Sequence, residues 1–322
     1  MKSGLDRISL GFFPTPLHEL KNLNRILHGP EIYIKRDDYT GLALGGNKVR
    51  KLEYIMAEAL NKGAQVIITT GAVTSNHARQ TAGAAAALGL KCQLVLSGDE
   101  PETRQGNFLL DHLMGAETYC VRPEEVEAHI DLLVSQNAGQ GQSTYVIPVG
   151  GSCMPGIISY VDAYQEIKEQ NQLEFDAIVM AVGTGSTCAG LNVGARMAGD
   201  KTKIVGIGIG LGDREWCQME IARLSNLAEN FLGLEPSSPD QIIVFEEYMG
   251  KGYAIPDDRV RDTIKLLASK EAVILDPVYS AKAMVGLLDL IEKGYFKKGE
   301  KILFLATGGC PEIFGFNHFL SE

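Results

Sequence analysis

The feature that most limits the fold of this chain is a regular alternation of short apolar runs with longer segments of helical periodicity. The apolar runs lie at residues 65–69, 92–96, 119–121, 145–148, 177–182, 204–209, 242–245 and 302–306. The helical segments lie at residues 51–62, 76–88, 124–136, 154–170, 189–198, 257–271 and 280–293. Near-continuous apolar strands that alternate with helices are typical of parallel sheets covered on both faces. The sequence therefore predicts an α/β protein with mostly parallel, doubly wound sheets.

The length of 322 residues exceeds what one hydrophobic core usually serves, so two packed lobes are expected. The sequence shows no long linker and no internal repeat, and the glycine pairs Gly45-Gly46 and Gly150-Gly151 are the best candidates for turning points between lobes. We predict a large lobe of residues 1–50 and 155–322 and a smaller inserted lobe of residues 51–154. The active site is expected in the cleft between them.

Charge and composition exclude several classes of protein. The formal net charge of -10 argues against a surface for nucleic acid or anionic membranes. No apolar run of about 18 residues occurs, so a cytoplasmic location is expected. The six cysteines form no C-x-x-C pair and no histidine cluster accompanies them, so we expect neither disulfides nor a metal site.

A lysine follows a glycine turn in Gly45-Gly46-Asn47-Lys48-Val49-Arg50-Lys51, at the predicted start of a helix. The helix N-terminus and Arg50 should both favour loss of the proton from the Lys48 amine. An uncharged amine can attack a carbonyl group, so Lys48 is a candidate nucleophile. Taken alone, the motif is more typical of a solvated loop lysine.

A glycine-rich loop follows the buried strand at residues 177–182. Its residues, Gly183-Thr184-Gly185-Ser186-Thr187, precede a helix and combine exposed backbone N–H groups with hydroxyl donors, which indicates an anion site. A P-loop would need Gly-Lys-Ser/Thr, and Cys188 replaces the third glycine of the dinucleotide motif. A phosphate monoester on a small cofactor fits better, although a turn without a ligand remains an alternative.

Polar side chains also follow the strand at residues 65–69 and the last strand. Ser75, Asn76 and His77 open an alanine-rich helix, where Ser75 or Asn76 could serve only as an N-cap. Tyr279 precedes a further helix and could be a core residue, and Thr307 stands beside Gly308-Gly309, where another group can approach the backbone closely.

Together these motifs resemble one family, the D-cysteine desulfhydrases and 1-aminocyclopropane-1-carboxylate deaminases. The resemblance runs from Pro14 almost to the C-terminus. It is carried by Gly-Gly-Asn-Lys-x-Arg-Lys-Leu-Glu at residues 45–53, Ser-Asn-His at 75–77, Gly-Thr-Gly-Ser-Thr at 183–187, Asp-Pro-Val-Tyr at 276–279 and Thr-Gly-Gly at 307–309. It implies the two-lobed tryptophan-synthase β-like fold (fold type II), pyridoxal 5'-phosphate as cofactor and a homodimer.

The resemblance also implies a role for each matching residue. Lys48 would bind the cofactor covalently, and Asn76 would bond its phenolic oxygen. Thr307 would face the pyridine nitrogen, and Ser75 would handle the substrate carboxylate or a proton, with Asn76 and His77 also at the substrate. The remaining matches are the phosphate loop (Gly183, Thr184, Gly185, Ser186 and Thr187) and two active-site tyrosines (Tyr253 and Tyr279).

Departures within the motifs bear on the substrate, a small amino acid. Ser280 and His77 stand where the deaminases carry glutamate and glutamine, and both resemble the desulfhydrases. By contrast, Thr74 stands where many desulfhydrases carry glutamine, and the Gly-Thr-Gly-Ser-Thr loop is closer to the deaminase type. We predict α,β-elimination of D-cysteine to pyruvate, ammonia and hydrogen sulfide, with Lys48 as a base near the α carbon. L-cysteate and 1-aminocyclopropane-1-carboxylate remain alternative substrates. A NAD-dependent dehydrogenase is disfavoured by the missing glycine.

Overall fold

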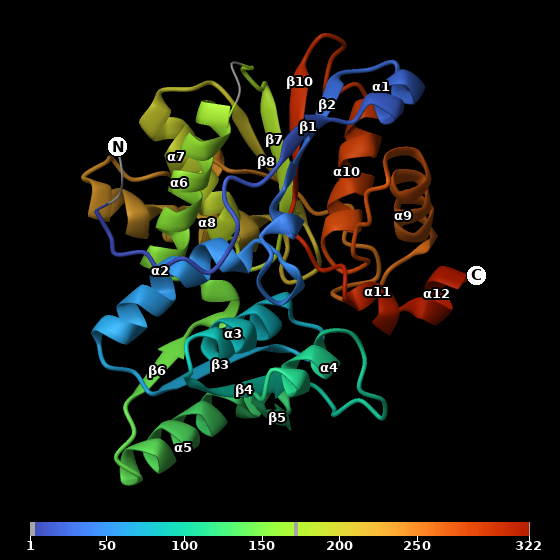
Figure 1. The fold of residues 1–322 in the computed structure, drawn as a ribbon. Coiled ribbons are helices and arrows are strands. Elements are labelled where there is room, and N and C mark those ends of the chain that lie inside the picture. Colours follow the sequence, from blue (N-terminus) through green and yellow to red (C-terminus); the bar gives the residue numbers. More distant parts are fainter. Residues whose placement is uncertain (1–3, 171–172, 322) are drawn as a thin grey trace.

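The computed structural model describes residues 4–170 and 173–321, within which the strands form a six-stranded and a four-stranded sheet (Figure 1). The strands are β1 (Leu17–Glu19), β2 (Glu31–Arg36), β3 (Val66–Ala72), β4 (Lys91–Ser97), β5 (Glu117–Val121), β6 (Thr144–Ile147), β7 (Ala177–Val182), β8 (Lys203–Gly208), β9 (Ile243–Phe245) and β10 (Lys301–Ala306). Every apolar run singled out in the sequence lies at one of these strands. The α/β prediction is confirmed.

The helices are α1 (Lys21–Leu27), α2 (Lys48–Asn61), α3 (Asn76–Ala87), α4 (Gly106–Leu113), α5 (Val126–Gly139), α6 (Met154–Gln170), α7 (Ser186–Ala198), α8 (Arg214–Leu232), α9 (Asp258–Glu271), α10 (Ser280–Glu292), α11 (Glu312–Gly315) and α12 (Asn317–Ser321). The seven helical segments of the sequence match α2, α3, α5, α6, α7, α9 and α10. The long helix α8 was not predicted.

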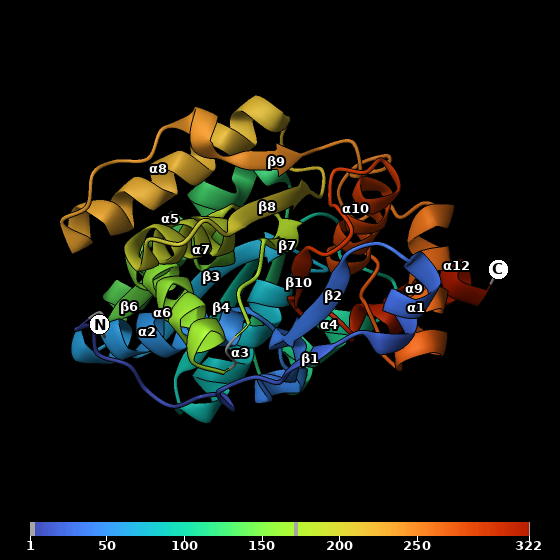
Figure 2. The ribbon, with the colours of Figure 1, turned by 90° about the horizontal axis from the view of Figure 1, so that it is seen from above.

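The large sheet has the strand order β1-β2-β10-β7-β8-β9 and is parallel except for the short edge strand β1. Successive side chains of β7 point to opposite faces. Ile178, Met180 and Val182 pack against α6, α7 and α8, while Ala177 and Val179 pack into the core on the side of α1, α9 and α10. Figure 2 shows these two groups of helices on opposite sides of the sheet. Burial on both faces explains why the strands are almost wholly apolar.

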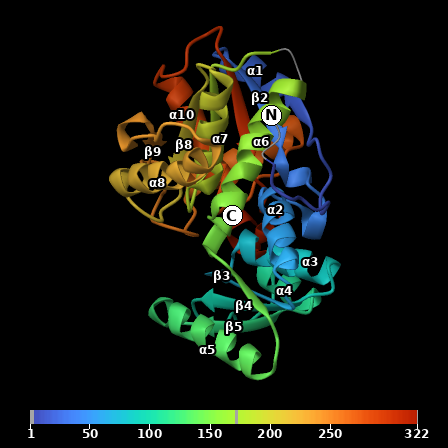
Figure 3. The same ribbon diagram turned by 90° about the vertical axis from the view of Figure 1, so that its left-hand side faces the viewer.

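The small sheet is entirely parallel, in the order β5-β4-β3-β6. Ile67 of β3 packs with α2, α3 and α4, whereas Val66 and Ile68 pack with α5 on the other face. Figure 3 shows α5 on the outer side of this sheet and α2, α3 and α4 between it and the large sheet. Helices α2 and α3 therefore lie where the two sheets approach each other.

The proposed lobe limits can be compared with the elements. The limit between residues 50 and 51 falls inside α2, and the limit between residues 154 and 155 falls in the first turn of α6. The division into lobes stays a prediction. None of the helices within the described ranges is long and apolar enough to cross a membrane.

Candidate active site

A cavity of about 430 Å³ lies at the carboxyl ends of strands from both sheets. Its walls include the ends of β3 and β7 and the residues that follow β6 and β10. Every predicted site residue lines it, namely Lys48, Ser75, Asn76, His77, Gly183, Thr184, Gly185, Ser186, Thr187, Tyr253, Tyr279 and Thr307. Open parallel sheets bind ligands at this end of their strands. Segments far apart in the sequence thus meet at one site.

Lys48 is the first residue of α2, after the turn at Gly45 and Gly46. Both glycines have positive φ, 74° and 134°, which favours glycine over residues with a Cβ. The hydroxyl of Thr40 accepts from the N–H of Gly46 (2.8 Å) and donates to its carbonyl oxygen (2.9 Å), which fixes the turn. The Lys48 amine donates to the carbonyl oxygen of Gly150 (3.3 Å). The fixed turn before Lys48 and the hydrogen bond to Gly150 together hold the Lys48 side chain at the cavity.

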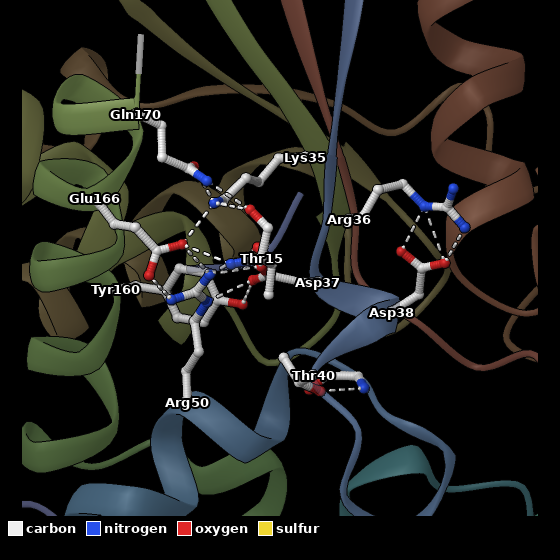
Figure 4. Close-up of polar contacts among 11 residues, drawn as sticks. Thr15, Lys35, Arg36, Asp37, Asp38, Thr40, Arg50, Tyr160, Glu166 and Gln170 are labelled. Atoms are coloured by element: carbon white, nitrogen blue, oxygen red, sulfur yellow. Dashed lines mark hydrogen bonds and ion pairs between the residues drawn. The ribbon is translucent and has the colours of Figure 1, made fainter. Parts of the chain in front are cut away.

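The pKa of the Lys48 amine is lowered for a different reason from the one predicted. Burial lowers the pKa of Lys48 from 10.5 to about 8, which a hydrogen bond with Lys51 partly opposes. The expected contribution of Arg50 is wrong, because its guanidinium donates to Asp37 (2.8 Å) and Glu166 (2.8 and 2.9 Å) instead. Figure 4 shows Arg50 within this buried ionic cluster. Residues two apart on a helix do not share a face, whereas residues three apart do.

Lys51, which the sequence reasoning missed, lies one helical turn after Lys48 and lines the same cavity. Its amine donates to the Ser186 hydroxyl (2.7 Å) and to the Gly150 carbonyl oxygen (3.1 Å). Burial, followed by the charge of Lys48, lowers the pKa of Lys51 well below its usual range. Across the described part of the chain, neither lysine forms an ion pair with a carboxylate. Two buried amines without a carboxylate favour an anionic ligand.

The glycine-rich loop joins β7 to α7 directly beside Lys51. Gly185 is the N-cap of α7 with φ 86°, and Ser186 begins the helix. The N–H groups of this first turn lack helical partners. Ser152 donates to the Thr184 hydroxyl (2.7 Å), and the side-chain amide of Asn47 donates to the Thr187 hydroxyl (3.2 Å). A helix N-terminus, oriented hydroxyls and the Lys51 amine together form an anion site.

Ser75, Asn76 and His77 lie at the start of α3 and line the same cavity. Ser75 is its N-cap, and its hydroxyl accepts from the N–H of Ala78 (3.2 Å). The Thr69 hydroxyl donates to the Ile147 carbonyl oxygen (2.8 Å), so it accepts from Nε2 of His77 (2.9 Å). Burial, followed by Lys48 and Lys51, holds the pKa of His77 well below its usual range. His77 is therefore a neutral side chain with its proton on Nε2.

The two tyrosines contact each other at the cavity. Their hydroxyl oxygens are 2.5 Å apart, and the Thr74 hydroxyl lies 3.5 Å from that of Tyr253. Burial raises the pKa of both tyrosines, so both keep their protons at neutral pH. Asp276 accepts from the N–H groups of Tyr279 and Ser280 (both 2.8 Å) and from the Ser280 hydroxyl (2.5 Å). The Asp276 carboxylate therefore fixes the backbone of Tyr279 and Ser280 and accepts the hydrogen bond of the Ser280 hydroxyl.

Thr307 and the glycines after it complete the site. Thr307 follows β10, and its carbonyl oxygen accepts from the N–H of Asn47 (2.8 Å). Gly308 and Gly309 have φ values of 100° and 104°. A Cβ on Gly308 would lie 2.6 Å from Cα of Gly46, and one on Gly309 would lie 2.6 Å from Cγ of Asp276. The absent side chains allow three segments of the site to approach one another.

The described residues include no group of three or more His, Cys, Asp or Glu side chains that could hold a metal ion. All six cysteines are free.

Comparison with known proteins identifies the family. The family described as pyridoxal-phosphate dependent enzyme matches residues 8–308. A putative 1-aminocyclopropane-1-carboxylate deaminase from Pyrococcus horikoshii is 41% identical over 96% of this chain and 93% of its own length. A D-cysteine desulfhydrase from Klebsiella pneumoniae is 39% identical over 98% of this chain and 97% of its own length. A crystal structure described as an ACC deaminase homologue superposes with a TM-score of 0.91 at 39% identity, over 99% of this chain and 96% of the other.

Proposed function

Because the chain belongs to the pyridoxal-phosphate-dependent enzyme family, we propose that it catalyses α,β-elimination of D-cysteine to pyruvate, ammonia and hydrogen sulfide. The observation that carries this proposal is the placement of two carboxylate-free amines, Lys48 and Lys51, beside the Gly183–Thr187 loop. One amine is available for covalent chemistry, and the other is placed to neutralise a phosphate. Relatives of about the same identity differ in name, since one is called a putative deaminase and another a desulfhydrase. The choice of substrate therefore depends on the residues of the site.

The cavity fits pyridoxal 5'-phosphate. Lys51 and the first turn of α7 would hold the phosphate, Lys48 the aldehyde carbon, Asn76 the phenolic oxygen and Thr307 the pyridine nitrogen. When bound, the cofactor supplies an aldehyde that condenses with amines and a ring that withdraws electrons from the α carbon. A carboxylate beside the nitrogen would strengthen that withdrawal, whereas the Thr307 hydroxyl is neutral. Elimination of a good leaving group requires less electron withdrawal by the cofactor ring than the opening of a cyclopropane ring does.

Lys48 has two tasks in this scheme. With a pKa of about 8, its amine is partly uncharged near neutral pH, so it can both bond the cofactor and accept the proton of the α carbon. At the far wall, the Ser75 hydroxyl and the N-terminus of α3 would hold the substrate carboxylate. Such a hold orients the bond between the α carbon and its hydrogen, and orientation can contribute several orders of magnitude in rate.

The remaining wall suits a thiol leaving group. Tyr253 and Tyr279 keep their protons, so either can donate to the departing sulfur. Among the described residues that line the cavity, the only lysines or arginines are Lys48 and Lys51, and both are assigned to the cofactor. No further cation is left for the sulfonate of L-cysteate. The net reaction breaks the C–H and C–S bonds of the substrate, and one water hydrolyses the carbon–nitrogen bond to give ammonia and pyruvate.

The test is release of 2-oxo acid and ammonia from D-cysteine, β-chloro-D-alanine, D-serine, L-cysteate and 1-aminocyclopropane-1-carboxylate. We expect D-cysteine to give the highest kcat/KM, with one sulfide for each pyruvate. A signal dominated by L-cysteate or by the cyclopropane amino acid would overturn the substrate and leave the cofactor in place. Borohydride reduction and peptide mapping should locate the cofactor on Lys48, and Lys48→Arg is the control. Failure of the wild-type protein to retain the cofactor would overturn the proposed function.

A further inference from the structure

We propose that Asn107 is a positioning residue that decides which end of the Asn76 amide faces the cofactor site. Asn107 does not line the cavity, and it lies at the start of α4, more than 30 residues after Asn76 in the chain. The inference rests on the proposed function in one respect, namely that Asn76 contacts the phenolic oxygen of the cofactor. An amide side chain has nearly the same shape at both ends, so only the polarity of its partners decides which end points where.

The donor–acceptor order of these hydrogen bonds is set by Arg79, whose side chain on α3 is fully buried. A guanidinium can only donate hydrogen bonds. Arg79 donates from Nε to Oδ1 of Asn107 (2.6 Å), and its other nitrogens donate to the carbonyl oxygens of Ala43 and Gly45. The oxygen of the Asn107 amide is therefore committed to Arg79.

The other end of the Asn107 amide is the donor end. It donates to the carbonyl oxygen of Thr74 (2.8 Å) and to Oδ1 of Asn76 (2.8 Å). With its oxygen occupied, Asn76 directs its NH₂ group elsewhere, and Nδ2 lies 2.8 Å from where a Cβ of Gly309 would stand. The donor end of the Asn76 amide thus lies beside Gly309, and it is the end that Asn107 leaves free for a ligand in the cavity that Asn76 lines.

Asn107 is itself held in place by the C-terminal part of the chain. Its backbone N–H donates to Oε1 of Glu312 (2.6 Å), which lies on α11. Gly106 has φ 55°, and a Cβ there would lie 2.5 Å from the same carboxylate oxygen, so glycine is needed for this approach. Glu312 and Arg79 thus fix the backbone and the side chain of Asn107 from two sides.

The direction of the Asn76 amide matters because the phenolic oxygen of the cofactor carries negative charge. A donor facing it makes a charge-assisted hydrogen bond, whereas a carbonyl oxygen facing it would repel it. The relay from Arg79 through Asn107 to Asn76 therefore prepares the site before the cofactor arrives. The benefit should appear as cofactor affinity, independently of turnover.

The experiment reverses the polarity. Asn107→Asp keeps an acceptor for Arg79 and replaces the donor end by an acceptor, so Asn76 should turn its NH₂ away from the cavity. Asn107→Leu removes the polarity at similar size and without charge, which leaves Asn76 free to turn. We expect the dissociation constant of pyridoxal 5'-phosphate to rise at least tenfold for Asn107→Asp and by a smaller factor for Asn107→Leu. The pH titration of the visible cofactor band should shift in the same order.

Each variant is repeated in the Asn76→Ala background. There, Asn107→Leu should leave cofactor affinity unchanged, and Asn107→Asp should show only the smaller effect of its charge. Equal effects in both backgrounds, or a greater loss with leucine than with aspartate, would overturn the positioning role while wild-type binding still upholds the proposed function. Should Asn107→Asp fail to fold, the uncharged Asn107→Leu pair decides the question by itself.

Discussion

Helix α2 carries cationic side chains on two faces, Arg50 on one and Lys48 and Lys51 on the other, and the surroundings of the two faces differ sharply. On one face, Arg50 pairs with Asp37 and Glu166, and Lys35 also pairs with Glu166, 2.5 Å away (Figure 4). On the other face, Lys48 and Lys51 line the cavity, where both amines donate to the Gly150 carbonyl oxygen and Lys51 also donates to the Ser186 hydroxyl. Arg50 and Lys35 are paired with carboxylates within the protein, whereas Lys48 and Lys51 have no carboxylate partner among the described residues.

The pKa of Arg50 responds to burial in the opposite way from the pKa values of Lys48 and Lys51. Burial opposes the charge of Arg50, but Asp37 and Glu166 outweigh it and raise the pKa of Arg50 well above its usual range. Burial likewise disfavours both carboxylates, yet the Arg50 guanidinium lowers the pKa of each. At Lys48 and Lys51 nothing outweighs burial, so their pKa values fall. A complete ionic cluster supports the fold, whereas an incomplete one prepares the protein for an anion.

The variant with the largest expected effect on stability is Arg50→Met, which tests the contrast between the two faces of α2. It leaves Asp37 and Glu166 buried with only Lys35 as a cationic partner, and removing one partner of a buried ion pair costs about 3–5 kcal/mol. We expect the free energy of unfolding of the cofactor-free protein, measured in urea, to fall by that amount. The matched control is Lys51→Met on the same helix, which strands no carboxylate and should cost far less. Equal losses for the two variants would mean that the faces do not differ.

The fold was more predictable from the sequence than the orientation of these cations. Strands such as β7 are apolar on both faces, so their signal is strong. Helix α8 escaped prediction because its apolar residues do not form one clean stripe, since Trp216, Met219 and Phe231 are exposed while Ile221 and Leu224 are buried. The short strand β1 has too few residues to show a period.

At the site, the residues themselves were predictable and their partners were not. The residues of the motifs reach the cavity because each motif ends a parallel strand or begins a helix, whereas Tyr253 reaches it from the loop between β9 and α9. The spacing of three between Lys48 and Lys51 could have revealed the second amine. Arg50 was misassigned, because its partners Asp37 and Glu166 come from segments far apart in sequence. Contacts over such separations leave no local pattern to read.

A second test concerns the anion that Lys48 and Lys51 are proposed to bind. If Lys51 neutralises the cofactor phosphate, Lys51→Met should lose a hydrogen bond between charged groups, worth about 1.5–3 kcal/mol. The dissociation constant of pyridoxal 5'-phosphate should then rise roughly 10- to 150-fold. Affinity for pyridoxal, which lacks the phosphate, should stay constant, and Lys51→Arg should retain much of the wild-type affinity. A parallel loss for pyridoxal would place Lys51 elsewhere in the site.

The smallest effect is the pH dependence of the fold that Lys48 confers. In the folded protein its pKa is about 8, against 10.5 for an ordinary lysine, so between these values the unfolded chain holds more protons. The charged form therefore weakens the folded protein below about pH 8, and the penalty fades as pH rises towards 10.5. Cofactor-free wild type should gain about 1 kcal/mol relative to Lys48→Met across this window, because Lys48 is partly exposed and solvent therefore screens part of the shift. Urea midpoints at pH 8 and pH 10 measure it, and a difference that does not change with pH would mean that Lys48 titrates as an exposed lysine, which removes the contrast between the two faces of α2.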